Sequence, residues 1–243
     1  MLSIIIIAYN EEEHLPLLLE SLAEQTIQNF EVIVVDSNSI DKTATIAHNY
    51  SSRFTEFTYN KLSAPLGPGY ARNCGAELCK YERILFLDAD TILPSRFIEQ
   101  VIHDISKKTI DVATCRIRIS EGDILSNAAA LFLNFFMIAL YPFYSSGYGA
   151  CLLSSKQVHQ TIGGFREDLG ICEDCDYIKR ARRDFNFKFH ILNPIFFTSN
   201  RRSKTENGFS MMIKYIKVHV YRMITKKEIL QGNITYTYGN FNV

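Results

Sequence analysis

Two carboxylates separated by a single residue, Asp88 and Asp90, follow the apolar run Arg83–Leu87. Side chains two residues apart in an extended segment point to the same side, so this Asp-x-Asp can present two oxygen ligands to one cation. Mg²⁺ and Mn²⁺ prefer such oxygens, and the phosphates of a substrate can complete their coordination. The alternative is that the two acids only end a strand, so the motif needs support from elsewhere in the chain.

Two further segments carry groups that could act on a substrate. Glu173 and Asp174 begin a segment that also contains several basic residues, and a carboxylate there could serve as a general base. It could equally complement the dipole of a helix and pair with arginines one turn further on. Arg72 follows the loop Gly67-Pro68-Gly69, where its planar guanidinium would suit a diphosphate.

Short apolar runs alternate with segments of helical periodicity over the first ninety residues, and these elements must position the acids. The runs predict strands at Ser3–Ala8, Glu31–Val35, Glu56–Tyr59 and Arg83–Leu87, and helices around Leu15–Leu22, Thr43–Tyr50 and Tyr70–Cys79. This rhythm predicts an α/β fold with an open, mostly parallel sheet flanked by helices. Ligands of such sheets bind at the carboxyl ends of the strands, where Asp36 would meet Asp88 and Asp90. Carboxylates that meet there repel one another unless a cation or a ligand compensates, which predicts a site.

Six short motifs in a fixed order make the chain resemble the family 2 glycosyltransferases of the GT-A fold. They are Tyr9-Asn10-Glu11, Asp36 with Ser39-x-Asp41-x-Thr43, Gly67 with Ala71-Arg72-Asn73, Leu87-Asp88-Ala89-Asp90, Gly163-Gly164-Phe165-x-Glu167 and Glu173-Asp174-x-Asp176. The match spans residues 2–205. The resemblance implies an inverting enzyme that moves one sugar from a nucleoside diphosphate sugar to a hydroxyl group of an acceptor.

On the donor side, the resemblance implies a role for each matching residue. The nucleotide would be bound by Ala8, Tyr9, Glu11 and Asp36, with Asp36 near the base and ribose. Arg72 would face the diphosphate, and the pair Arg201 and Arg202, after the strand-like run Ile195–Ser199, could approach the diphosphate or a phosphorylated acceptor.

The resemblance also divides the acids between metal and base. Asp90 would bind Mn²⁺ or Mg²⁺ directly, and Asp88 would hold the ribose or support the metal. Asp174 would be the general base that deprotonates the acceptor, with Glu173 as the reserve candidate. The ion and Arg72 would then stabilise the charge that develops on the leaving diphosphate.

The resemblance further implies the domain organisation and limits the reaction. Residues 1–205 would form the GT-A domain, with a nucleotide-sugar-binding half at 1–92 and an acceptor-binding half at 93–205, and residues 206–243 a basic amphipathic helix and tail. Ser37 and Asn38 depart from the family's Asp-Asp-Gly-Ser turn, which leaves the base open, and a UDP-sugar is expected rather than a GDP-sugar. The sequence has no Trp and hence no Gln-x-x-Arg-Trp element, which favours a single transfer over polymerisation.

Composition narrows the other function classes. With 26 basic and 26 acidic residues the net charge is zero, which argues against a nucleic-acid partner. The opening apolar run has no basic flank, so a secretory signal is not expected and the chain should be cytoplasmic, with the cytoplasmic face of a membrane as one alternative. The turn after the first strand lacks Gly-x-Gly-x-x-Gly, which argues against a dehydrogenase. A nucleotide-sugar-binding protein without catalysis is the remaining rival.

Two apolar segments concern the acceptor, whose identity the sequence leaves open. The run Ala128–Tyr141 is too short to span a membrane, and we expect it to be buried in the core or in a dimer interface rather than to dip into a bilayer toward a lipid-linked or cell-envelope acceptor. Residues 209–224 combine apolar residues at helical spacing with lysines, which suits either a core contact or an anionic membrane surface. The oligomeric state is open.

The six cysteines are expected to be reduced thiols. Cys172-x-x-Cys175 has no companion pair and lies within the Glu-Asp motif, so neither a zinc site nor a redox role is expected there.

Overall fold

The computed structural model of the chain describes residues 1–120, 124–141, 144, 146–199, 208–230, 237–238 and 241–242. Arg201 and Arg202, which the sequence places near phosphate groups, lie outside these residues. So does the predicted domain boundary at residue 205. Among the described residues, no helix is both long and apolar enough to span a bilayer.

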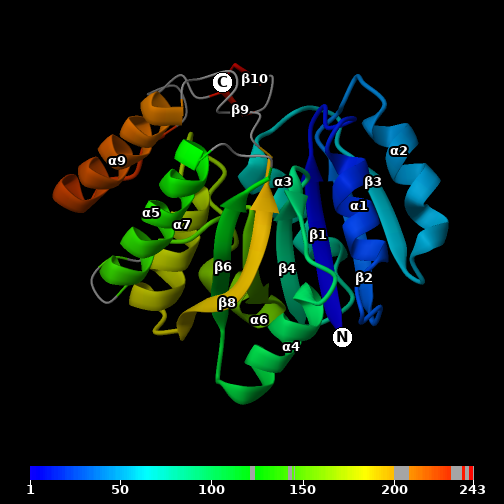
Figure 1. The fold of residues 1–243 in the computed structure, drawn as a ribbon, viewed down its shortest axis with the longest axis horizontal. Helices are drawn as coiled ribbons and strands as arrows, with labels where there is room; N and C mark the ends of the chain where they lie inside the picture. The colour runs from blue at the N-terminus through cyan, green and yellow to red at the C-terminus, as the bar shows by residue number, and fades with distance from the viewer. Residues whose placement is uncertain are drawn as a thin grey trace.

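One mixed sheet forms the centre of the molecule, with its strands in the order β3-β2-β1-β4-β7-β6-β8-β5 (Figure 1). The strands are β1 (Leu2–Ala8), β2 (Phe30–Asp36), β3 (Phe57–Lys61), β4 (Arg83–Asp88), β5 (Thr91–Ile92), β6 (Val112–Ile119), β7 (Cys151–Ser155) and β8 (Phe189–Thr198). Strands β3, β2, β1 and β4 run parallel, as the alternation of strand and helix predicts. Strand β7 runs antiparallel to β4 and β6, and β5 antiparallel to β8, so the second half of the sheet is mixed. A separate antiparallel pair joins β9 (Thr237–Tyr238) to β10 (Phe241–Asn242).

Helices lie against both faces of this sheet (Figure 1). They are α1 (Leu15–Ala23), α2 (Thr43–Tyr50), α3 (Pro68–Leu78), α4 (Phe97–Lys107), α5 (Ile124–Leu140), α6 (Lys156–Ile162), α7 (Glu173–Lys179) and α9 (Gly208–Thr225), with short helical turns η1 (Ser51–Arg53) and η2 (Arg180–Asp184). Helix α3 begins with Pro68, whose missing N–H and fixed φ suit a first turn, directly after Gly67 at a φ of 91°.

The alternation of side chains along β1 sorts the core into two layers. Ile4 and Ile6 pack with the apolar faces of α1 and α4, whereas Ile5 packs on the other face with α3, α6 and α7. A parallel strand that is buried on both faces has a nearly continuous apolar sequence. This is why β1 and β2 do not alternate between apolar and polar residues.

The strand register brings the polar strand ends together. Ala8 at the end of β1 is opposite Asp36 at the end of β2, and Ile7 is opposite Asp88 at the end of β4. The chain then passes from Asp88 to β5, which pairs with the end of β8. The predicted edge of acids is therefore formed by the carboxyl ends of β1, β2 and β4.

The apolar segment after residue 127 forms the second half of α5, and the interpretation that it is buried in the core is wrong. Only one side of the helix is covered, at Ala130, Asn134 and Met137, whereas Leu131 is 60% exposed and Phe135 is 69% exposed. The covered side is fixed by Asn134, whose amide donates to the carbonyl of Ile117 and accepts its N–H, as a strand neighbour would. The amide thus pairs with the backbone of β6 beyond Thr114, where its pairing with β7 ends, and turns the aromatic side outward.

Helix α3 packs so closely on the sheet that Gly75 leaves no room for a side chain. A Cβ added there would lie 2.4 Å from Cγ2 of Ile5 and 3.2 Å from Cγ2 of Val35. Because both neighbours are enclosed β-branched side chains, the helix itself would have to move.

We expect Gly75→Ala to lower the free energy of unfolding by about 1–3 kcal/mol through overpacking, even though alanine favours a helix. Urea denaturation would measure this change. Glu77→Ala on the exposed side of α3 is the control and should stay within about 0.5 kcal/mol of the unmodified chain. A Gly75→Ala variant as stable as the control would contradict the close approach of α3 to β1.

Candidate active site

A buried arginine stands at the centre of the acids. Arg72 of α3 is 2% exposed, and its Nη2 donates to Oδ1 of Asp88 at 2.7 Å while Nη1 donates to Oε1 of Glu173 at 2.6 Å. The ring of Phe165 lies against the guanidinium, 5.4 Å from centroid to Cζ. One side chain therefore joins the end of β4 to the beginning of α7.

Both terminal amino groups of Arg72 contact carboxylates, and its place at a donor diphosphate, which the family resemblance implies, stays a prediction. Burial alone would lower the pKa of Arg72, but the charges of Asp88, Glu173 and Asp174 outweigh it and hold the pKa above its usual value. Arg72 thus remains a cation inside the protein and acts as a clamp between two acids.

Asp174 follows Glu173 in α7, and backbone N–H groups hold its carboxylate. Its Oδ2 accepts the N–H of Gly149 at 2.6 Å, and its Oδ1 accepts the N–H of Cys175 at 2.7 Å. A Cβ added at Gly149 would lie 2.9 Å from Oδ2 of Asp174 and 3.1 Å from Nη2 of Arg72. Gly149 therefore lies between the two side chains, and Asp88, Glu173 and Asp174 converge on one small volume.

The surroundings also change the acidity of these carboxyl groups. Burial raises the pKa of Asp174 to about 7, with the neighbouring Cys175 adding to the rise. Burial likewise raises the pKa of Glu173, although Arg72 opposes it. A carboxyl group with a pKa near neutrality is a stronger base than an ordinary aspartate, which suits proton transfer from a hydroxyl group.

The loop that carries Phe165 is fixed to α3 by Asn73. The amide nitrogen of Asn73 donates to the carbonyl of Phe165 at 2.9 Å and to the carboxylate of Glu167 at 2.8 Å, and its oxygen accepts the N–H of Phe165 at 2.8 Å. Gly164, at a φ of 70°, approaches Asn73 so closely that an added Cβ would lie 2.7 Å from its Oδ1. The motif that ends in Asn73 and the motif that contains Phe165 are thus in direct contact.

The third acid of the Glu-Asp-x-Asp motif has a structural role. Asp176 is 3% exposed and accepts from Nε of Arg180 at 2.7 Å. The same guanidinium donates to the carbonyls of Ile162 at 2.5 Å and Gly164 at 2.7 Å, which tethers the loop to α7.

The Asp-x-Asp pair lies at the crossing from β4 to β5. Asp90 is attached to the end of β8, because its carboxylate accepts the hydroxyl of Ser199 at 3.3 Å and its carbonyl accepts the N–H of Ser199 at 3.1 Å. Asp88 faces Arg72, and its side chain is 26% exposed. Around Arg72 the carboxylates of Asp88, Glu173 and Asp174 outnumber the single guanidinium. Hard oxygen donors with an excess of negative charge fit a divalent cation such as Mn²⁺ or Mg²⁺.

Asp36, which the family resemblance places near the base and ribose, lies at the end of β2. It is fully enclosed, with Oδ1 accepting the N–H of Ser39 at 2.8 Å and Oδ2 accepting the hydroxyl of Tyr59 at 2.6 Å. These bonds fix the turn after β2. Its role toward a nucleotide stays a prediction.

The predicted nucleotide-binding residues after β1 lie against that turn. Ala8 is buried and its carbonyl accepts the N–H of Ser37, while Tyr9 is half-buried. The N–H of Glu11 donates to the hydroxyl of Thr43 at 2.8 Å, and its carboxylate lies 3.2 Å from Nδ1 of His14. Ala8 and Asp36 thus lie opposite each other at the ends of β1 and β2, and β1 is also the neighbour of β4, which ends at Asp88.

Gly149 was missed by sequence reasoning, as was the supporting amide of Asn73. The only signal for the first is the pair of glycines in Gly147-Tyr148-Gly149, and a glycine pair does not reveal which distant side chain needs the space. Asn73 belongs to the motif Ala71-Arg72-Asn73, but its hydrogen-bond partners lie more than ninety residues away along the chain.

The model of the glycosyl transferase family 2 matches residues 3–167, which include the strand ends, Arg72 and the Gly-Gly-Phe loop. The chain belongs to glycosyl transferase family 2. An uncharacterised glycosyltransferase of Haemophilus influenzae is 26% identical over 97% of this chain and 82% of its own length. A 4,4'-diaponeurosporenoate glycosyltransferase of Staphylococcus haemolyticus is 36% identical over 44% of this chain, which covers only 29% of that enzyme.

Solved structures of glycosyltransferases share the fold. The mannosyltransferase PcManGT of Pyrobaculum calidifontis, in complex with GDP-Man and Mn²⁺, superposes with a TM-score of 0.76 over 96% of this chain and 66% of its own, at 17% identity. TarS of S. aureus, in complex with UDP-GlcNAc, gives a TM-score of 0.66 over 82% of this chain and 58% of its own, at 22% identity. The predicted GT-A fold is confirmed.

We expect Gly149→Ala to reduce glycosyltransferase activity about 100-fold, since a displacement of about 1 Å at reacting groups can have that effect. The added methyl group would push Asp174 away from Arg72. Release of nucleoside diphosphate from a panel of nucleotide sugars would measure the loss, and the melting temperature would show that the fold persists. Gln100→Ala, on the exposed side of α4, is the control. Full activity in Gly149→Ala would mean that this contact does not position Asp174 for catalysis.

Proposed function

We propose that this glycosyltransferase moves one sugar from a nucleoside diphosphate sugar to an acceptor hydroxyl, with a divalent metal ion and with inversion at the anomeric carbon. The observation that supports the proposal best is the cluster in which Arg72 and Gly149 hold Asp88, Glu173 and Asp174 together. The transfer needs a metal-binding acid and a basic carboxylate in one substrate-binding site, and this cluster contains both kinds of group.

On the donor side, Asp90 and Asp88 would hold Mn²⁺ or Mg²⁺, which would neutralise charge on the leaving diphosphate. Arg72 keeps the carboxylate of Asp88 in place from behind. The similar structures hold UDP-GlcNAc in one case and GDP-Man with Mn²⁺ in another, which supports a nucleoside diphosphate sugar as donor. We favour a UDP-sugar, and the donor panel should include GDP-sugars.

On the acceptor side, Asp174 would take the proton of the attacking hydroxyl group. The N–H groups of Gly149 and Cys175 fix the orientation of its carboxylate, and burial gives it basicity. Glu173 is the weaker candidate, because Arg72 holds one of its oxygens at 2.6 Å and stabilises its charged form. A single attack by the activated hydroxyl, from the side opposite the leaving diphosphate, inverts the anomeric centre.

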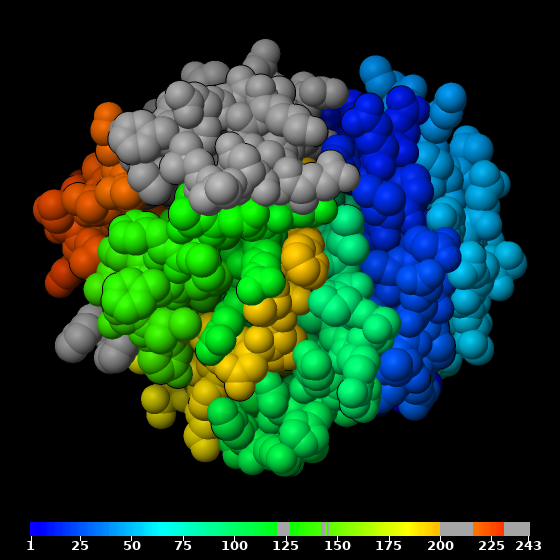
Figure 2. Space-filling model, viewed as in Figure 1, coloured from blue at the N-terminus to red at the C-terminus, as the bar shows by residue number. Residues whose placement is uncertain are grey.

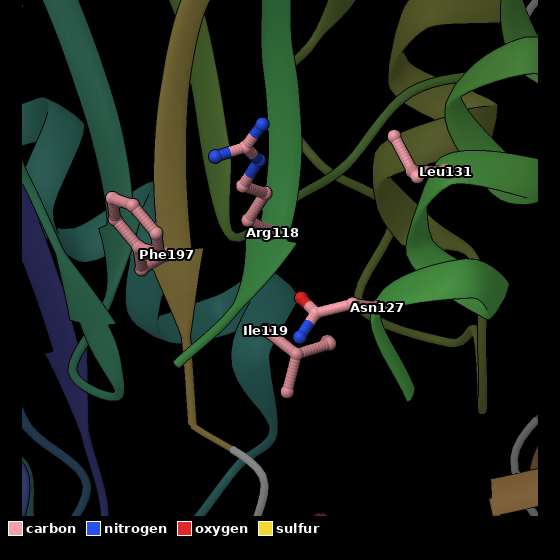
Figure 3. Close-up of a pocket in the computed structure, with 5 residues that line it drawn as sticks. All are labelled: Arg118, Ile119, Asn127, Leu131 and Phe197. Carbon is pink, nitrogen blue, oxygen red and sulfur yellow. The ribbon is translucent and has the colours of Figure 1, made fainter. Parts of the chain in front are cut away.

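A hollow of about 320 Å³ between β6, β8 and α5 supports an acceptor with both an anionic and an apolar part (Figure 3). It is lined by Arg118, Ile119, Asn127, Leu131 and Phe197. Phe197, which lines the hollow, is opposite Ile92 in the β5–β8 pair, and Ile92 lies two residues along the chain from Asp90. The guanidinium suits a phosphate, and the apolar wall suits a hydrocarbon chain.

Exposed apolar side chains extend this wall over two helices. Figure 2 shows α5 in green and α9 in orange on the same side of the molecule. They expose Phe132, Phe135 and Ile138 on α5 and Val220, Met223 and Ile224 on α9, beside the exposed Lys217, Lys226 and Lys227. Apolar side chains next to lysines fit an anionic bilayer surface, where a lipid-linked acceptor would be found.

The two acids should fail in different ways. We expect Asp174→Asn to keep donor affinity while transfer falls at least about 100-fold, because the general base is lost. Asp90→Ala should weaken Mn²⁺-dependent donor binding. Calorimetry with UDP- and GDP-sugars would measure binding, and nucleoside diphosphate release would measure transfer. Asp168→Asn, at an exposed aspartate, is the control. Equal loss of donor binding in both variants would contradict the assigned roles, and binding without any release by the unmodified chain would favour the non-catalytic rival.

We expect Phe135→Ser to reduce binding to anionic vesicles at least about tenfold, since a phenylalanine side chain that enters an apolar phase contributes about 1.5–3 kcal/mol. Co-sedimentation with phosphatidylglycerol vesicles would measure binding. Phe185→Ser replaces a phenylalanine that is 45% exposed but lies outside both helices, and it should bind normally. An unmodified chain that stays in the supernatant at low salt would exclude a membrane surface as the partner of α5 and α9.

A further inference from the structure

Two cysteines and a histidine from distant parts of the chain meet beside the proposed general base. Cys172 and Cys175 flank Glu173 and Asp174 at the beginning of α7, and His219 comes from the middle of α9. One ligand atom from each of the three side chains lies within 4.8 Å of the other two. Cys172 is 6% exposed and Cys175 is 2% exposed. We propose that these three side chains bind a Zn²⁺ ion, at a site separate from the Asp-x-Asp pair.

The sulfur and nitrogen ligands of this cluster favour one kind of metal ion. Thiolate sulfur and imidazole nitrogen are the preferred ligands of Zn²⁺, whereas Mg²⁺ and Mn²⁺ prefer the oxygens of Asp88 and Asp90. A tetrahedral ion with Zn–S and Zn–N bonds of about 2.0–2.3 Å needs ligand atoms about 3.3–3.8 Å apart. The observed limit of 4.8 Å therefore requires only small side-chain rotations to close around an ion.

The histidine is already oriented by a hydrogen-bond chain of the kind that supports metal ligands. Nδ1 of His219 lies 2.9 Å from the hydroxyl of Tyr144, and that hydroxyl accepts from Nη1 of Arg222 at 2.9 Å. Arg222 in turn donates to Glu228 at 2.6 Å, and Lys179 of α7 donates to the same carboxylate at 2.8 Å. A metal-bound imidazole is commonly fixed through its other ring nitrogen in this way.

Sequence reasoning set aside zinc because Cys172-x-x-Cys175 has no companion pair of cysteines. The missing partner is a histidine of a helix that follows β8, so the spacing along the chain gives no signal for it. Residues in and next to α7 and α9 also form a small apolar cluster, which contains Ile171, Cys172, Cys175, Val218 and Ile229. An ion here would join α9 to the helix that carries Asp174, and three protein ligands would leave a fourth position for water.

Cobalt provides a probe that separates this site from the oxygen site. Co²⁺ bound to thiolates in a tetrahedral site gives an intense sulfur-to-metal charge-transfer absorption, which an all-oxygen site cannot produce. We expect the reduced, metal-stripped chain to bind one Co²⁺ with this absorption and to lose it when Zn²⁺ is added. Cys172→Ser, Cys175→Ser and His219→Asn should each abolish or strongly weaken it.

Matched variants separate this inference from the proposed function. Asp90→Ala should keep the cobalt–thiolate absorption, because it changes only the oxygen site. Cys74→Ser, at a half-buried cysteine outside the cluster, should keep it as well. Zn²⁺ should raise the melting temperature of the unmodified chain and of Asp90→Ala but not of His219→Asn.

Either of two results would overturn the zinc site. One is the absence of the cobalt–thiolate absorption in a chain for which a thiol titration shows that all cysteines are reduced. The other concerns a purified chain that contains no zinc and has a Cys172–Cys175 disulfide, seen as a mass two hydrogens below that of the reduced chain. If this chain still binds no metal after the disulfide is reduced, the zinc site is excluded. Neither result would bear on sugar transfer, since none of these measurements uses a nucleotide sugar.

Discussion

The structure depends on the enclosure of one guanidinium among carboxylates. A charge that is removed from water is strongly unfavourable unless oppositely charged groups replace the lost hydration, and Arg72 is 2% exposed. Asp88 and Glu173 supply that replacement, so the end of β4 and the beginning of α7 must meet at Arg72. Because the surrounding acids outnumber the guanidinium, the same enclosure leaves negative charge for a divalent cation. The contact that joins the end of β4 to the beginning of α7 is therefore also the contact that gathers the acids of the candidate site.

Small residues and backbone groups make this arrangement rigid. Gly149 allows the segment before β7 to approach both Arg72 and Asp174, and its N–H fixes one carboxylate oxygen. Asn73 fixes the loop that places the ring of Phe165 against the guanidinium. Groups held in this way need little reorganisation when a substrate binds, which is the condition under which electrostatic stabilisation is strongest.

The sequence predicted what local pattern controls and failed where distant neighbours decide. Buried β-branched runs separated by helical periodicity gave β1 to β4 and the edge at Asp36 and Asp88, because register follows from the pattern. The convergence of Asp174 on that edge came only from the family resemblance. The expectation that the segment after residue 127 is buried in the core was wrong, because an apolar helix has the same sequence pattern whether its aromatic side meets a core or another surface. The contact of Arg72 with Glu173 could not be predicted from the local loop, because the two residues are 101 positions apart.

Helix α7 carries both Glu173, which binds Arg72, and Asp174, the proposed general base. It has seven residues, too few to be stable alone, so its position is set by what surrounds it. Tyr177, fully enclosed, stacks on Phe165 with centroids 4.3 Å apart and hydrogen-bonds Ser154, while Glu173 is held by Arg72. Its other side meets α9 through Cys175 and Val218. Helix α9, which also exposes Val220, Met223 and Ile224 to solvent, therefore packs on the helix that carries Asp174, the proposed general base.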